Sequence, residues 1–95
     1  MQVEVEFLAA ERGGRKSPVA PTGYRPLLRF EGFEQLVGLA ELLFDGERWV
    51  APGEVAQGQL RLAVPPEAFA TPRGGDRFEI LEGLRLVGHG TVVDP

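Results

Sequence analysis

The sequence predicts an all-β protein, either a sandwich or a closed barrel. Six or seven short apolar segments are separated by glycine- and proline-rich turns, and no segment has a convincing helical pattern. Turns recur roughly every eight to twelve residues, which is typical of such folds. The 95 residues, 43% of them hydrophobic, can bury one small core. We therefore expect a single domain over residues 1–95.

The first element is a strand, because Val3, Val5 and Phe7 alternate with polar residues at a period of two. It should bury its apolar face and expose the other. Residues 11–23 then collect five glycines and prolines, which interrupt the backbone too often for a regular element. A long surface loop is expected there.

Residues 24–30 resume as a strand, and Leu28 and Phe30 are expected to face the core. Residues 34–44 are ambiguous, because their apolar positions also satisfy helical spacing. The Asp-Gly pair at 45–46 is a strong hairpin signal and favours the strand interpretation.

The second half continues as strands separated by turns. After the hairpin signal we expect a short strand at residues 48–50, a longer one at 55–64 and a final strand at 84–93. Phe69 is a candidate core anchor in the intervening connector, and Phe78 with Ile80 indicates one more strand.

The final strand contains Gly88 and Gly90, two residues apart and hence on the same face. Glycine inside a strand indicates a close approach of the backbone to another group. Either a bend of the barrel or a partner surface would explain the pair.

The chain has few residues suited to catalysis. It has no cysteine and one histidine, so we expect neither a metal site nor a cofactor. Nothing around Ser17 resembles a nucleophile elbow, and His89 is expected to be an ordinary strand residue. Gly13 and Gly14 lack the spacing and the following helix of a nucleotide-binding loop. We therefore expect a protein that is not an enzyme.

The N-terminal segment carries two glutamates where a secretory signal would be positive. The longest apolar stretch is far shorter than the ~20 residues of a membrane helix. We expect no membrane association and a cytoplasmic location.

Charge is distributed unevenly along the chain. Five cations and no acid lie between residues 12 and 29, whereas the rest of the chain holds all 14 acidic residues. Such a segment could neutralise phosphates of a nucleic acid. Alternatively, its cations pair with surface glutamates. The five cations are Arg12, Arg15, Lys16, Arg25 and Arg29.

Several motifs appear in a characteristic order. They are Gly-Gly-Arg-Lys-Ser-Pro at 13–18, Gly-Tyr-Arg-Pro at 23–26, Val-Ala-Pro-Gly-Glu at 50–54, Arg-Phe-Glu-Ile-Leu-Glu-Gly at 77–83 and Leu-Val-Gly-His-Gly-Thr-Val-Val at 86–93. Together they resemble the C-terminal β-barrel, or third domain, of elongation factor Tu. The resemblance covers nearly the whole chain.

This resemblance implies a closed six-stranded antiparallel β-barrel. In that family the barrel contacts the backbone of aminoacyl-tRNA and also meets other protein domains. The chain has no counterpart of the GTPase domain, so we expect no GTP binding. The resemblance nominates Arg15, Lys16, Ser17, Gly88 and Gly90 for contact with RNA or another partner, and the basic stretch adds Arg12 and Arg25.

Two functional hypotheses follow. The first is a non-enzymatic binding module that docks on tRNA or on a translation-related protein. The alternative is a protein-interaction or regulatory barrel that has lost RNA binding, suggested by the net charge of −4 and by Glu31 and Glu34 near the expected RNA surface. In that case Trp49 could serve as a contact, although a lone Trp beside a turn more often fills the core.

Overall fold

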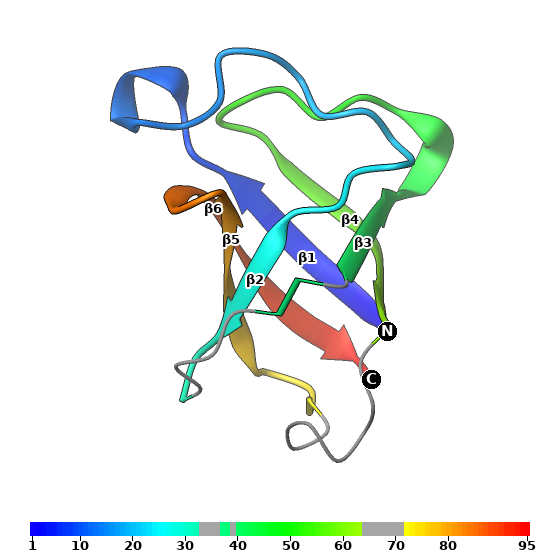
Figure 1. The fold of residues 1–95 in the computed structure, drawn as a ribbon. Helices are drawn as coiled ribbons and strands as arrows, with labels where there is room; N and C mark the ends of the chain where they lie inside the picture. Colours follow the sequence, from blue (N-terminus) through cyan, green and yellow to red (C-terminus); the bar gives the residue numbers. More distant parts are fainter. Residues whose placement is uncertain (33–36, 39, 64–71) are drawn as a thin grey trace.

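A computed structural model describes residues 1–32, 37–38, 40–63 and 72–95. This part of the chain is all-β, as predicted, and its only helical turns are short 3-10 turns (Figure 1). None of its helical turns is long and apolar enough to cross a bilayer. The strands are β1 Gln2–Phe7, β2 Leu27–Phe30, β3 Ala40–Phe44, β4 Val55–Leu62, β5 Arg77–Glu82 and β6 Arg85–Asp94, and the 3-10 turns are η1 Ala10–Arg12 and η2 Asp45–Glu47.

The six strands form one antiparallel sheet in the order β2-β5-β6-β1-β4-β3. The prediction of a closed barrel was wrong, because the sheet is an open half-barrel that curves through 221°. Among the described residues, no ladder joins the terminal strands β2 and β3. Between the two edges the described chain forms only the isolated bridges Leu28–Val37 and Tyr24–Leu42.

The edge of β3 is covered by the segment that precedes β2. Leu42 and Phe44 donate backbone hydrogen bonds of 2.9 and 3.0 Å to the carbonyls of Tyr24 and Pro21. These bonds satisfy polar groups that a bare edge strand would expose. The segment that precedes β2 therefore occupies part of the β3 edge, where β2 itself would pair in a closed barrel.

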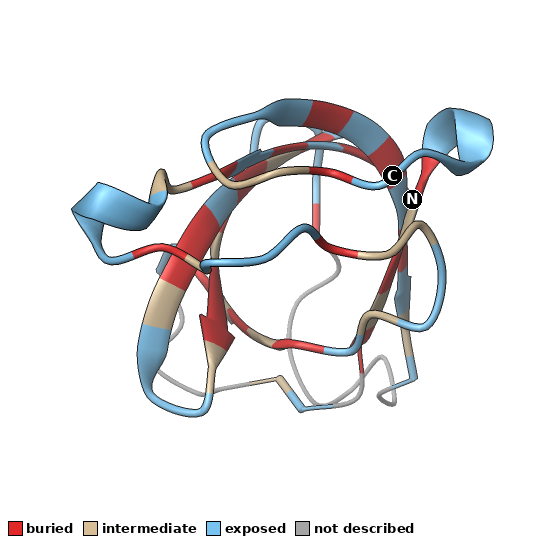
Figure 2. Ribbon diagram, turned by 90° about the horizontal axis from the view of Figure 1, so that it is seen from above, coloured by how far each residue is buried: buried red, intermediate tan, exposed pale blue. Residues whose placement is uncertain are grey.

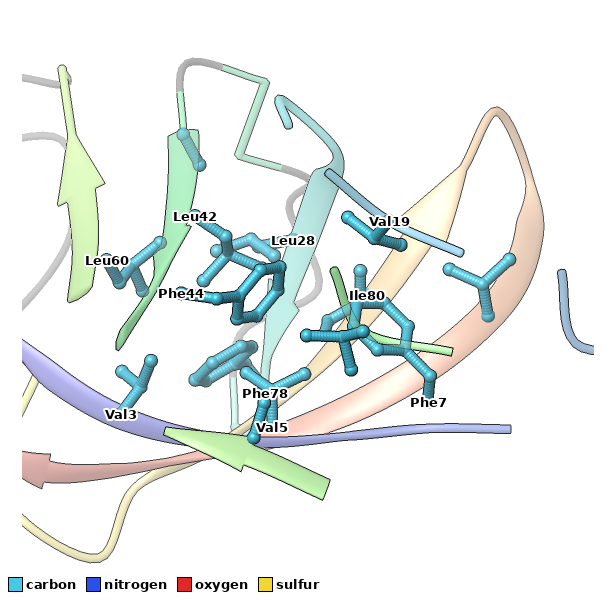
Figure 3. Packing of buried hydrophobic residues seen from close by; sticks show 14 of the residues in the cluster. Val3, Val5, Phe7, Val19, Leu28, Leu42, Phe44, Leu60, Phe78 and Ile80 are labelled. Carbon is cyan, nitrogen blue, oxygen red and sulfur yellow. The ribbon is translucent and has the colours of Figure 1, made fainter. Parts of the chain in front are cut away.

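The sheet curls around a cluster of buried apolar side chains. Figure 2 shows buried positions along the ribbon of the curled sheet. Phe7, Leu28, Leu42, Phe78 and Ile80 are among the largest members of the cluster, and each is at most 2% exposed. They project from four strands, β1, β2, β3 and β5, toward a common centre (Figure 3). The period-two pattern of β1 is confirmed, and so are the predicted core positions of β2.

The hairpin region differs from the prediction. Residues 48–50 form no strand, and Val50 makes only an isolated bridge to Val19. Trp49 is 62% exposed and therefore does not fill the core. The strand interpretation of residues 34–44 is confirmed for 40–44, whereas Val37 makes only an isolated bridge. Residues 34–36, Leu39 and Phe69 lie outside the described residues.

Gly88 and Gly90 are buried in β6 and allow close packing. A Cβ on Gly88 would lie 2.7 Å from the carbonyl oxygen of Glu6, and one on Gly90 would lie 2.1 Å from the ring of Phe78. Both distances are too short for any side chain. The close approach expected at this pair is therefore present, and it is directed into the protein.

Candidate functional site: the basic loop

The segment between β1 and Val19 begins with a tight turn. We call residues 10–17 the basic loop. After η1, Gly13 adopts a φ of 88°, in the left-handed region that glycine tolerates. Gly14 is buried against the chain, because a Cβ there would lie 2.0 Å from the carbonyl oxygen of Leu8. The two glycines are therefore required by the backbone path.

The side chain of Arg15 fixes the loop to the sheet. Its Nη1 donates to Oε2 of Glu82 in β5, and the hydroxyl of Tyr24 donates to the same oxygen at 2.7 Å. The guanidinium carbon also lies 5.5 Å from the centroid of the Tyr24 ring. These three residues come from three of the motifs that resemble elongation factor Tu.

Tyr24 is held in a largely apolar setting. Its ring packs edge-on against Phe7, with the centroids 5.9 Å apart. Burial, followed by the hydrogen bond and the negative charge of Glu82, raises the pKa of Tyr24 far above its usual value of 10.0. The phenol therefore remains a hydrogen-bond donor over the whole physiological range.

A second arginine supports the loop from the β5–β6 hairpin. Arg85 Nε donates to the carbonyl oxygen of Gly13 at 3.0 Å, and its Nη2 donates to that of Gly14. The loop accordingly lies next to this hairpin (Figure 1). Arg85 is not among the residues that the sequence motifs nominated. The predicted turn after Glu82 was the available signal, because it pairs Glu82 with Arg85 across the hairpin.

Two cations of the loop have no partner for their side chains within the described parts of the chain. Arg12 and Lys16 are exposed, and neither side chain makes a hydrogen bond or an ion pair there. Ser17 is also exposed, and its carbonyl and hydroxyl oxygens both lie 3.2 Å from the Arg15 guanidinium. The loop therefore offers charge at Arg12 and Lys16 and uses Arg15 for support.

The pairing interpretation of the basic stretch holds for two residues. Arg15 pairs with Glu82, and Arg29 pairs with Glu79 at 2.6 Å. The hydrogen bond and charge of Glu79 raise the pKa of Arg29 further above its ordinary value. Arg12, Lys16 and Arg25 have no such carboxylate among the described residues.

The remaining nominated residues lie away from the basic loop surface. Arg25 lines a separate hollow with Glu41 and Arg61, which belong to β3 and β4. Gly88 and Gly90 face inward from β6. The structure thus brings Arg12, Arg15, Lys16 and Ser17 into one loop and leaves these three residues elsewhere.

A groove crosses the outer face of the sheet on β1, β6, β5 and β2. Strand register aligns Glu6, His89, Glu79 and Arg29 in one row. The groove has a volume of about 660 Å³. His89 is exposed, and carboxylate-bearing residues stand beside it on both neighbouring strands. The alternation in β1 predicted that Glu6 is exposed. The alignment of Glu6 with His89, Glu79 and Arg29 depends on the register between strands, which the sequence pattern does not specify.

Neither surface has the groups of a metal centre. Within the described ranges no three side chains of His, Cys, Asp or Glu are grouped so that they could hold a metal ion. The Ser17 hydroxyl is engaged with Arg15 on the loop, and His89 lies between Glu6 and Glu79 on the outer face. What the arrangement provides is charged surface for binding.

No known protein-family model matches the chain. The relationship to elongation factor Tu therefore remains a prediction based on its motifs. The structure adds that Arg15, Tyr24 and Glu82, each from a different motif, meet at one point beneath the basic loop.

Proposed function

We propose that this chain is a non-enzymatic, cytoplasmic binding module of the elongation factor Tu C-terminal type, which docks on the phosphate backbone of RNA through its basic loop. tRNA is the first candidate. The observation that carries the proposal is that Arg12 and Lys16, which lie on a loop held in place by other residues, are exposed and have no carboxylate partner among the described residues.

Preorganisation supports this assignment. Arg15 in the loop donates to Glu82 of β5, and Arg85 of the β5–β6 hairpin donates to loop carbonyl oxygens. The side chains of Arg12 and Lys16 therefore project from a backbone that is held in place. Binding then costs less ordering entropy than it would for a flexible basic tail. The Arg85 guanidinium bonds to neutral carbonyl oxygens, so its positive charge adds to the local potential.

The affinity should be modest and strongly salt-dependent. Each phosphate contact made by Lys or Arg contributes a slope of about −0.7 to −0.9 to the dependence of log affinity on log salt. Two free cations therefore predict a contribution of about −1.5 to that slope. A single small surface of this kind binds weakly by itself, and a second contact to the same RNA would raise the overall affinity.

The test compares two double variants that remove equal charge. Arg12→Gln with Lys16→Gln removes the loop cations, and Arg61→Gln with Arg73→Gln removes two exposed cations elsewhere. Binding of a labelled tRNA transcript is measured by fluorescence anisotropy over a salt series.

We expect the loop variant to bind about tenfold more weakly and its salt slope to fall by about 1 to 2, because each lost phosphate contact changes that slope by about 1. The control should stay within about twofold of the wild type, as expected when no phosphate contact is lost. Equal losses in both variants, or no binding by the wild type at low salt, would refute the proposal.

A second candidate function is suggested by exposed apolar side chains. Trp49 is 62% exposed and Leu84, at the β5–β6 turn, is 88% exposed. Aromatic anchors of this kind are enriched at protein interfaces. A protein-interaction barrel would bind its partner with little salt dependence, and Trp49→Ser would weaken that binding while leaving tRNA binding unchanged.

A further inference from the structure

The groove on the outer face differs in charge from the basic loop. Four glutamates and two arginines line it, together with His89, Thr91 and apolar groups. Its volume of about 660 Å³ lies within the usual range for ligand sites, roughly 300 to 1,000 Å³. Its net charge is therefore negative although two cations are present.

The acidic side of the groove is the outward face of β1. Glu4 and Glu6 are exposed there, and the side chain of Glu6 makes no hydrogen bond or ion pair within the described chain. Glu4 accepts a 2.6 Å hydrogen bond from the neutral amide of Gln57, which leaves its charge unneutralised. Glu31, near the other end of the groove, has no ion-pair partner in the same parts of the chain.

The opposite side of the groove is different. Glu79 is already paired with Arg29, and Arg77 lies beside them on β5. A ligand with one cationic edge would therefore align with β1. Apolar contact is available next to the acidic side, because Val55, which is paired with Glu6 across β1 and β4, is 48% exposed and also lines the groove.

The spacing of the acidic side matches an extended peptide. Residues two apart on one strand face are about 7 Å apart, twice the rise per residue. Glu4 and Glu6 stand in this relation on β1. An extended chain has the same repeat, so two side chains that are two residues apart in a bound segment would each meet a carboxylate.

The net charge of the protein bears on the identity of the occupant. Two copies of a chain of net charge −4 repel one another, which opposes docking of a second copy in an acidic groove. A separate basic protein is attracted to it instead. We propose that this groove binds an extended segment of a basic partner protein in which arginine or lysine alternates with apolar residues.

This proposal is independent of the RNA-binding role, because it uses the outer face and none of the basic loop. Guanidinium groups of the segment would pair with Glu4 and Glu6, and its apolar side chains would lie over Val55. The two surfaces could therefore be occupied together.

The test uses two labelled peptides of equal composition. In one, arginine and valine alternate, and in the other all arginines precede all valines. Glu4→Gln with Glu6→Gln is compared with Glu11→Gln plus Glu47→Gln, which removes the same charge from exposed residues outside the groove. Binding is measured by fluorescence anisotropy, and amide shifts of Gly90 and Thr91 are followed by NMR.

We expect the wild type to bind the alternating peptide several-fold more tightly than the block peptide. The groove variant should lose about tenfold in affinity, as interfacial charge pairs commonly do, and the control variant less than about twofold. The groove variant should still bind tRNA like the wild type, which separates this test from the test of the basic loop.

Three outcomes would overturn the proposal. They are equal affinity for the two peptides, equal losses in the two variants, and shifts that spare Gly90 and Thr91. Self-association of the wild type that is lost in the groove variant would identify a second copy as the occupant and would likewise refute a basic partner.

Discussion

The basic loop and the outer groove each contain an arginine–glutamate pair, but the two pairs do different work. In the loop, Glu82 holds both Arg15 and Tyr24, and the side chains of the ion pair are 23% and 34% exposed. In the groove, Arg29 and Glu79 hold only one another, with exposures of 43% and 33%. The two carboxylates are about equally exposed, so the pairs differ in their donors. Glu82 accepts from two residues of different segments and fixes a loop, whereas an isolated surface pair contributes little to stability.

The two regions also differ in the charges they leave free. The loop keeps Arg12 and Lys16 unpaired within the described chain, and the groove keeps Glu6 and Glu31 unpaired there. We therefore expect an anionic ligand at the basic loop and a cationic ligand in the groove. The net charge of −4 conceals this separation.

The largest losses of stability should come from glycine substitutions. One substitution should perturb the basic loop and the other the groove. In Gly14→Ala the new Cβ would clash with the backbone of Leu8, so we expect a loss of about 3 kcal/mol in the free energy of unfolding. Gly90→Ala displaces the ring of Phe78 and should cost about 2 kcal/mol. Denaturant unfolding measures both losses.

NMR spectra of the same variants locate the damage. Gly14→Ala should shift amides of the basic loop and spare those of the groove, and Gly90→Ala should do the reverse. If both variants shifted the same residues, the two regions would not be structurally independent.

A smaller effect distinguishes the two ion pairs. Glu82→Ala removes the common acceptor of Arg15 and Tyr24 and should cost about 2 kcal/mol, because hydrogen bonds to charged groups are lost. Glu79→Ala is the matched control and should cost about 0.5 kcal/mol, as for an exposed pair. Equal values from urea unfolding would contradict the distinction between an anchoring pair and a surface pair.

The smallest expected effect is a change in the stability contribution of Tyr24, and it appears only at alkaline pH. The pKa of Tyr24 is raised in the folded state, so its contribution to stability is complete below pH 10.0 and decreases above it, as the unfolded phenol ionises first. The stability difference between the wild type and Tyr24→Phe should therefore shrink as pH rises above 10.0. Unfolding free energies of both proteins across alkaline pH measure this.

The absorbance of the phenolate gives an independent reading, because Tyr24 is the only tyrosine in the chain. Its ionisation in the folded protein should be delayed relative to the unfolded protein. Ionisation at the same pH in both states would show that Glu82 and burial do not hold the phenol.

Much of the strand pattern was accessible from the sequence. Alternation identified the buried positions of β1 and placed Leu28 and Phe30 in the core. The hairpin signal at 45–46 was misleading for residues 48–50, which form no strand and pair only at Val50. Trp49 is exposed for the same reason, since it belongs to no strand that could direct it inward.

The site was predicted in part. Charge counting along the chain found Arg12 and Lys16, which are unpaired within the described residues, but it could not separate them from Arg15. The partner of Arg15 lies 67 positions away in the chain, and nothing local specifies that contact. The role of Arg85 was not predicted, because its hydrogen-bond acceptors are backbone carbonyl oxygens, which every residue has.

The sequence by itself determined the all-β class, most of the core and the segregation of charge, because period-two alternation and charge order are local properties. Tertiary structure decided the open half-barrel, the anchoring of Arg15 and the acidic groove. Each of these depends on which distant strands pair and in which register. A shift of one residue in that pairing would turn every side chain of a strand to the opposite face.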